Sequence, residues 1–265
     1  MKELHLLAIS ASPRVKGNSN FLLERAVYGA KETGKENLGI ELYSFHGKRF
    51  AACRQCYGCD KTQGECTIKD DFQELRDKWL IADIIVYSVP VYHMSIPGQL
   101  KCFFDRLGQS LSKRYPSGRR GEQPFHLKIV GNIAQGMDLF AGQEHAIREL
   151  INHSLLMNCV PITGNTYIGG GGWTIGSRDT TKIESMAEKR DPAALLSISA
   201  AESIGKRAVQ LALILKTGCR EHLDLLKREW VFQPIVERLD KEDAERTETG
   251  DCYGISQNHL DDKQA

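Results

Sequence analysis

The fold of this chain is decided near its N-terminus, by Leu4-His-Leu-Leu-Ala-Ile-Ser-Ala-Ser-Pro-Arg-Val-Lys-Gly-Asn-Ser19. The apolar run Leu4–Ile9 predicts a buried strand, and the amphipathic residues from about 20 to 31 predict the helix that follows it. The turn between them can bind a phosphate in front of the helix N-terminus, or it can simply cap that helix. The candidate phosphate-binding residues are Ser10, Ser12, Arg14, Gly17, Asn18 and Ser19.

The alternation of strand and helix continues along the chain. Further strands are expected at residues 39–45, 82–89, 126–134 and 160–168. Further helices are expected after Asp70-Asp71, over about 99–111 and 140–157, and from Asp191-Pro192 to about 216. Strands interleaved with helices in this way indicate a parallel sheet that is covered on both faces.

A second informative turn, Pro90–Pro97, directly follows the strand at 82–89. In a doubly wound sheet, ligands bind outside the carboxyl ends of the strands, at the switch point between the first and third strands. Two prolines and Tyr92 suit this turn to hold a flat ring, and the alternative is that Tyr92 only packs inside a tight turn.

Four cysteines lie within fourteen residues, at Cys53, Cys56, Cys59 and Cys66. Gaps of two, two and six residues let one loop bring four thiolates to a single [4Fe-4S] cluster. A zinc site and free redox-active thiols remain as alternatives. A disulfide framework is disfavoured, because such frameworks are typical of short secreted domains and this chain begins without a secretory signal.

Composition excludes several classes of function. The 35 Lys and Arg residues balance 34 Asp and Glu residues, so a net charge of +1 gives no general attraction for nucleic acid. No run of eighteen or more apolar residues occurs, so we expect no membrane span and a cytoplasmic, reducing location.

The C-terminal part differs from the rest, and we divide the chain into a domain at 1–218 and a helical extension at 219–265. Residues 222–239 are amphipathic and carry Trp230, with Pro234 expected to kink or end the helix. This segment packs either on its own domain or on another subunit. From Asp240 onward we expect a charged surface tail.

Two motifs of this chain resemble the NADPH-dependent FMN reductase-like branch of the flavodoxin superfold. They are Ser12-Pro13-Arg14-x2-Gly17-Asn18-Ser19 and Pro90-Val91-Tyr92-x4-Pro97-Gly98-x-Leu100-Lys101-x-Phe103-x-Asp105-Arg106. The cysteine loop, residues 46–69, followed by Asp70-Asp71, is similar to that of the iron-sulfur flavoproteins within that branch. The resemblance implies a flavodoxin-like three-layer sandwich with a five-stranded parallel sheet in the order 2-1-3-4-5.

The resemblance also implies FMN as a cofactor. Its phosphate would lie on the turn at 10–19, and its isoalloxazine ring along Pro90, Val91, Tyr92, His93 and Met94. Gly136 and the Gly169–Trp173 turn, which opens with Gly169, would complete the pocket. No catalytic acid, base or nucleophile stands out, although Tyr92 and His93 are placed to deliver a proton.

The implied function is that of an FMN-dependent oxidoreductase that couples a [4Fe-4S] cluster to FMN. NAD(P)H or ferredoxin would donate electrons to a small-molecule acceptor, and the protein would form a homodimer or homotetramer. The basic loop at 113–121 suits NADPH phosphates or an acidic ferredoxin, unless it is merely solvated. The alternatives are a cluster-free NAD(P)H-dependent FMN or quinone reductase and a non-catalytic flavin- or zinc-binding redox sensor.

Overall fold

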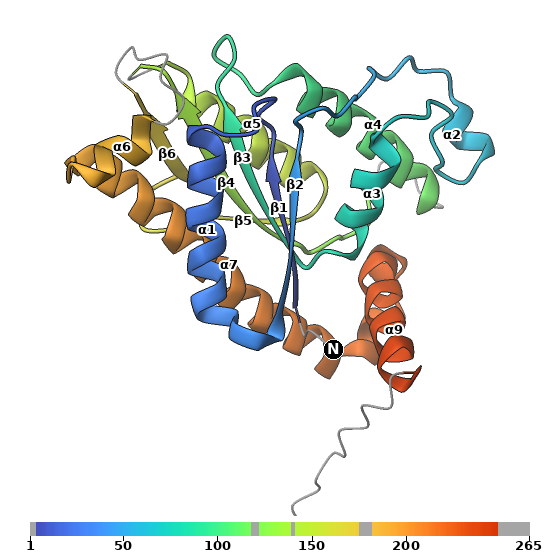
Figure 1. The fold of residues 1–265 in the computed structure, drawn as a ribbon. Helices are drawn as coiled ribbons and strands as arrows, with labels where there is room; N and C mark the ends of the chain where they lie inside the picture. The colour runs from blue at the N-terminus through green and yellow to red at the C-terminus, as the bar shows by residue number, and fades with distance from the viewer. Residues whose placement is uncertain (1–3, 118–121, 139–140, 175–181, 249–265) are drawn as a thin grey trace, which may run out of the picture.

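A central parallel sheet with helices on both faces organises the molecule (Figure 1). The computed structural model describes residues 4–117, 122–138, 141–174 and 182–248. The strands are β1 (Leu4–Ser10), β2 (Leu38–Ser44), β3 (Ile84–Pro90), β4 (Ile129–Gly136), β5 (Val160–Ile162) and β6 (Gly170–Trp173). Their order, β2-β1-β3-β4-β5, confirms the flavodoxin-like prediction.

Two helical layers cover the sheet. The helices are α1 (Asn18–Gly34), α2 (Gly58–Lys61), α3 (Phe72–Ile81), α4 (Gly98–Arg114), α5 (Gln143–Leu156), α6 (Lys182–Glu188), α7 (Pro192–Glu221), α8 (Leu223–Leu226) and α9 (Gln233–Glu248), with short 3-10 turns at Lys35–Asn37 and Trp230–Phe232. Residues of α1, α6 and α7 pack on one face of the sheet, and residues of α3, α4 and α5 pack on the other.

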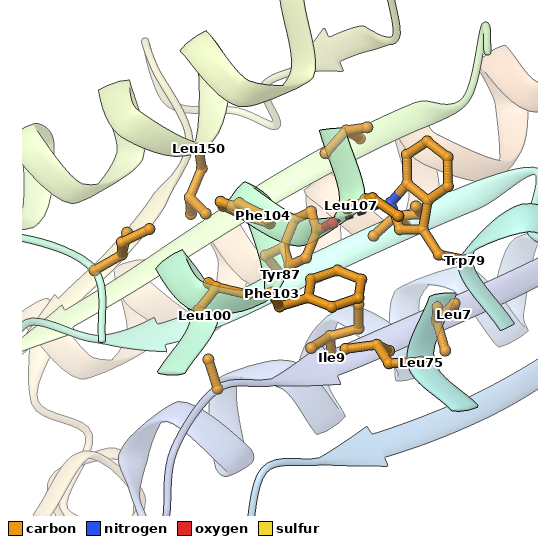
Figure 2. Packing of buried hydrophobic residues seen from close by; sticks show 14 of the residues in the cluster. Leu7, Ile9, Leu75, Trp79, Tyr87, Leu100, Phe103, Phe104, Leu107 and Leu150 are labelled. Carbon is orange, nitrogen blue, oxygen red and sulfur yellow. Dashed lines mark hydrogen bonds between the residues drawn. The ribbon is translucent and has the colours of Figure 1, made fainter. Parts of the chain in front are cut away.

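The core on the α3–α5 side is aromatic (Figure 2). Tyr87 from the middle of β3 is buried between the helices, and Trp79 of α3 donates from Nε1 to its hydroxyl at 3.2 Å. Phe103 and Phe104 of α4 fill the space next to them. Burial on both faces explains why β3 reads as a continuous apolar run in the sequence.

The fifth position of the sheet differs from the prediction. The strand expected at 160–168 ends at Ile162, and the Gly169–Trp173 segment, expected to be a turn, forms strand β6 instead. Both strands pair with β4, β5 with Ile129–Gly131 and β6 with Ile133–Gly136. Where the chain leaves the sheet between them, Arg207 Nη1 of α7 donates to the carbonyl oxygens of residues 163 and 164, at 3.0 and 2.7 Å.

The C-terminal segment packs on the rest of the protein. Helix α7 continues to Glu221, and Pro234 lies in the first turn of α9, where proline is tolerated, rather than ending a helix. The charged tail expected from Asp240 is helical as far as Glu248, while residues 249–265 lie outside the described part. Buried Glu242 pairs with Lys216 at 2.7 Å, which explains why this charged segment is ordered. None of the described helices is long and apolar enough to cross a membrane.

Candidate functional site

The loop between β1 and α1 lies at the carboxyl edge of the sheet. Its predicted phosphate-binding residues divide into buried ones (Ser10, Ser12, Asn18 and Ser19), the half-buried Gly17 and the exposed Arg14. Helix α1 begins after Gly17 without a side-chain cap among the described residues. An uncapped helix N-terminus beside buried hydroxyl groups favours an anionic ligand.

Asn20 organises this loop, although it is not among the residues predicted from the sequence. Its Nδ2 donates to the carbonyl oxygens of Arg14 and Val15, at 3.0 and 2.7 Å, and its Oδ1 accepts from Ser10 Oγ. Asn18, by contrast, accepts at Oδ1 from the backbone N–H of Ile183, 3.0 Å away at α6. The sequence does carry a signal for Asn20. An amide side chain in the first turn of a helix can donate to the carbonyl oxygens of the loop that precedes it.

The Pro90–Pro97 turn reverses tightly between Tyr92 and Ser95. The two residues exchange backbone hydrogen bonds of 2.9 and 3.0 Å. His93 and Met94 between them have φ angles of 46° and 67°, which are uncommon for residues other than glycine. Such conformations persist only where the surroundings enforce them, and they cluster at ligand-binding sites.

A carboxylate from α5 holds this turn in place. Glu149 Oε2 accepts from Ser95 Oγ at 2.7 Å and from the Ile96 N–H at 3.1 Å. Tyr92 and Met94 remain 45% and 54% exposed, while Pro90 and Val91 are half-buried at the end of β3. The turn therefore presents a rigid, partly apolar surface that suits a flat ring.

A cavity of about 450 Å³ borders the turn on the β6 side. Met94 and Gly169, both predicted from the sequence, line it together with the first turns of α5, with β6 and with the start of α7. Gly142 permits a close approach here, since a Cβ on it would lie 2.6 Å from Met94 Cα. Gly136 lies beneath the side chain of Gln143 instead of lining the cavity.

The four cysteines line one pocket of about 80 Å³. The loop that carries them curls around α2 beside α4 (Figure 1), with left-handed φ angles at Gln55, Tyr57 and Gln63. Within the described ranges, no three cysteine, histidine or carboxylate side chains converge closely enough to hold a single metal ion. The donor set nevertheless suits a multi-iron cluster, whose irons each take a separate thiolate.

Helices α3 and α4 anchor the cysteine loop. Arg106 of α4 pairs with Asp70 at 2.6 Å, and both side chains are largely buried. Gln73 Nε2 donates to the Cys66 and Ile68 carbonyl oxygens at 3.1 and 2.7 Å, and Ser110 Oγ donates to the Gly64 carbonyl oxygen at 2.5 Å. Two helices thus hold the second half of the loop.

Asp70 and Asp71, expected to cap α3, chiefly bind the start of the loop. Asp70 accepts from the N–H groups of Phe72 and Ala51 at 3.1 and 2.8 Å, and Asp71 accepts from the Arg49 N–H at 2.7 Å. Burial opposes ionisation of Asp70, but hydrogen bonds from Arg106 and these N–H groups lower its pKa overall. Asp70 is therefore a carboxylate at neutral pH.

The thiols differ in their electrostatic surroundings. The backbone N–H of Gly58 and the hydroxyl of Thr67 lower the pKa of Cys56. Burial and the neighbouring Asp60 raise the pKa of Cys59. Burial raises the pKa of Cys159 to about 11, and half-buried Cys102 packs against the same core.

The basic loop at 113–121 is partly described. Lys113 pairs with Asp60 at 3.2 Å and Arg114 with Glu237 at 3.7 Å, whereas residues 118–121 lie outside the described part. These two cations therefore bind acidic groups of the same chain.

Residues 4–174 match the family model of the NADPH-dependent FMN reductases. The chain belongs to this family. It is 33% identical over 175 residues to an iron-sulfur flavoprotein of Archaeoglobus fulgidus, covering 66% of this chain and 84% of the relative. An iron-sulfur flavoprotein of Methanocaldococcus jannaschii is 31% identical over 179 residues, covering 68% and 85%.

Solved structures support the same fold. RosB with a bound 8-demethyl-8-formylriboflavin-5'-phosphate intermediate aligns with a TM-score of 0.58 at 14% identity, covering 99% of this chain and 96% of RosB. The NAD(P)H:quinone oxidoreductase from Methanothermobacter marburgensis aligns with a TM-score of 0.55 at 16% identity, covering 77% and 98%. As a member of the FMN reductase family, the chain is a flavin-dependent oxidoreductase that uses FMN and a nicotinamide donor.

Proposed function

We propose that this flavin oxidoreductase couples FMN to a [4Fe-4S] cluster held by Cys53, Cys56, Cys59 and Cys66. The observation that carries the proposal is that all four cysteines line one pocket. Two relatives named iron-sulfur flavoproteins, at 33% and 31% identity, support it. Bound FMN would exchange hydride or single electrons, and the cluster would exchange single electrons only.

The chain's own groups would hold FMN at the carboxyl edge of the sheet. The open N-terminus of α1, with Ser12, Gly17 and Ser19, would bind the phosphate, and exposed Arg14 would cover it. Ser10, predicted for the same role, would support the loop, because its hydroxyl donates to Asn20. Asn18 would meet the phosphate only through its Nδ2 donor, because its Oδ1 is an acceptor and already accepts from the Ile183 N–H. Asn20 would keep the loop carbonyls turned away from the anion by binding two of them.

The Pro90–Pro97 turn would support the isoalloxazine ring. Its strained tip needs no rearrangement to meet a flat ligand, because Glu149 already holds it. Tyr92, His93 and Met94 at the tip would contact the ring. Gly169, which precedes β6 and lines the neighbouring cavity, would lie on its other side, whereas Gly136 is covered by the side chain of Gln143.

The cavity beside Met94 would receive the small-molecule acceptor or the nicotinamide. Its volume of about 450 Å³ lies in the range of small-molecule sites, and its walls are mostly apolar. A Cβ on Gly171 would meet only the Ala134 carbonyl oxygen, at 3.6 Å, so a side chain at this position has room to project. In Gly171→Val, we expect the KM for menadione to rise about tenfold, and the FMN content measured beside it separates this effect from loss of flavin. Gly108→Ala, where an added Cβ meets nothing within 4 Å, serves as the control.

Metal and sulfide analysis tests the cluster. After anaerobic purification and reconstitution, we expect about four iron and four acid-labile sulfide per chain together with FMN. Cys56→Ser should lose the cluster absorbance and keep FMN, whereas Cys102→Ala, on α4 outside the loop, should keep both. If the protein contains no sulfide but still oxidises NADPH, the cluster is contradicted and the function is that of a cluster-free reductase. If it binds zinc and shows no turnover, the function is that of a redox sensor.

The electron donor and the assembly are tested separately. Anaerobic mixing with NADPH, NADH or reduced ferredoxin shows which one bleaches the flavin absorbance. We propose that ferredoxin is a donor alongside the nicotinamide, and that the protein is a homodimer or homotetramer. Light scattering of the reconstituted protein measures the assembly, and a monomer at micromolar concentration would contradict it.

A further inference from the structure

We infer that Arg106 is a positioning residue that raises the reduction potential of the proposed cluster, by donating a hydrogen bond to the sulfur of Cys66. The inference rests on the proposed function, because it concerns the same four thiolates. Nothing in the flavin chemistry requires this arginine, which lies on α4 and faces the cysteine pocket.

The contacts of Arg106 centre on the closure of the cysteine loop. Its Nη2 lies 3.3 Å from Cys66 Sγ and donates to the Ile68 carbonyl oxygen at 2.9 Å. Its Nη1 donates to Asp70 at 2.6 and 2.8 Å and to the Ala51 carbonyl oxygen at 3.3 Å. One guanidinium group therefore bridges both ends of the loop, from residue 51 to residue 70.

The environment of Arg106 makes this hydrogen bond effective. Its side chain is 1% exposed and lies over the Phe72 ring, with the guanidinium carbon 4.2 Å from the ring centroid. Water competes poorly at such a site, so a charge-assisted N–H to sulfur keeps its strength. Among the described residues, no acceptor lies within reach of its Nε–H, which leaves one more donor beside the pocket.

Cys66 differs from the other three cysteines in this respect. Cys56 has the hydroxyl of Thr67 at 3.7 Å, and Cys59 lies 3.9 Å from the carboxylate of Asp60. Among the contacts of the described residues, Cys66 alone has a cationic donor on its sulfur. Hydrogen bonds to cluster sulfurs stabilise the more negative, reduced state, and they are one of the factors that set the potential.

The same helix joins this contact to the flavin side. Helix α4 begins at Gly98, directly after the Pro90–Pro97 turn, and Arg106 follows eight residues later, about 12 Å along the axis. Gln99, in the first turn of α4, donates to the Lys48 carbonyl oxygen at 3.4 Å, which ties the start of the cysteine loop to the same helix. Arg106 thus acts on the cluster from the helix that directly follows the turn proposed to support the FMN ring.

The test compares two variants. Asp70→Asn removes the counter-charge and keeps the donor, whereas the double variant Asp70→Asn/Arg106→Met removes both partners and leaves no buried charge unpaired. Anaerobic titration followed by electron paramagnetic resonance measures the cluster potential. We expect the reduction potential of the cluster to be lower in the double variant than in Asp70→Asn. The expected difference is about tenfold in the reduction equilibrium constant, which is 59 mV for one electron.

Controls separate this effect from general damage. Lys101→Met, on the exposed side of α4, should leave the cluster potential unchanged, and the FMN potential should stay constant throughout. Equal cluster potentials in the two Asp70 variants would overturn the inference and leave the proposed function intact. Wild-type protein without sulfide would overturn both.

A second variant covers loss of the cluster. If the double variant retains FMN but no sulfide, Arg106→Lys provides the measurement, because lysine keeps the charge and loses the planar fork that reaches both Asp70 and Cys66. A lowered potential in Arg106→Lys supports the inference. A wild-type potential in it overturns the inference.

Discussion

Replacing Asp83 by asparagine should loosen the C-terminal helix from the sheet. Asp83 is 4% exposed at the start of β3 and lies 2.9 Å from Lys216 Nζ of α7 and 3.1 Å from Arg238 Nε of α9. It also accepts from the His5 N–H at 3.0 Å, so one carboxylate joins β1, β3, α7 and α9. The variant keeps the shape of the side chain but leaves two buried cations facing a neutral amide.

The expected loss follows from these contacts. Removing one partner of a buried ion pair costs about 3–5 kcal/mol, and the lower end applies because Lys216 keeps Glu242 at 2.7 Å. A loss of about 3 kcal/mol lowers the Tm by roughly 6–12 °C in a chain of this size. Thermal unfolding of FMN-loaded protein at pH 7 measures it. Lys241→Gln, in a pair of 3.9 Å on the exposed side of α9, is the control and should cost under about 1 kcal/mol.

The pH dependence gives a second readout. Burial opposes ionisation of Asp83, but Arg238 and Lys216 outweigh it and lower its pKa. A lowered folded pKa stabilises the protein above the unfolded value of about 3.9, and this stabilisation disappears as the pH falls through the folded value. The difference between wild type and Asp83→Asn should therefore be complete at pH 5 and above and shrink at lower pH. A difference under 1 kcal/mol at pH 7, or one that persists at low pH, would refute this reasoning.

Three further predictions concern single contacts. Gly205→Ala places a Cβ 1.8 Å from the Ala26 carbonyl oxygen, so it should force α1 and α7 apart and cost about 1–3 kcal/mol in chemical unfolding, unlike Gly108→Ala in open space. Glu149→Ala removes the acceptor that holds the Pro90–Pro97 turn, and fluorescence titration should show the Kd for FMN rising by about tenfold. An unchanged Kd would mean that the turn does not contribute to FMN binding. In cluster-free protein, mass spectrometry should find Cys56 alkylated first and Cys159 last, because their pKa shifts have opposite signs; the reverse order would contradict the structure.

Local patterns predicted much of this molecule. The apolar run of β3 and the strand-turn-helix at the N-terminus were predicted from periodicity and are observed, while the strand order followed from the family resemblance. Asp191-Pro192 was correctly predicted to begin α7, where Asp191 Oδ1 accepts from the Ala193 and Ala194 N–H groups at 3.0 Å. These features depend on residues a few positions apart, so periodicity and capping chemistry reveal them.

Other features could not be predicted in this way. Four consecutive glycines suggested a loop, yet three of them form β6 together with Trp173, because β4 provides a free edge for pairing. Asp240 onward looked like a solvated tail, yet Glu242 meets Lys216 across 26 residues. Glu149 binds a turn that lies more than fifty residues before it.

The sequence by itself determined the family, the parallel sheet and the gathering of four thiols in one short loop, because each is encoded in neighbouring residues. Only the tertiary structure decided that Arg106 reaches Cys66 from forty positions away, and that α9 closes on the sheet through Asp83 and Lys216. The physical reason is that a buried charge must find its partner wherever packing brings one within reach, and separation along the chain does not specify that partner.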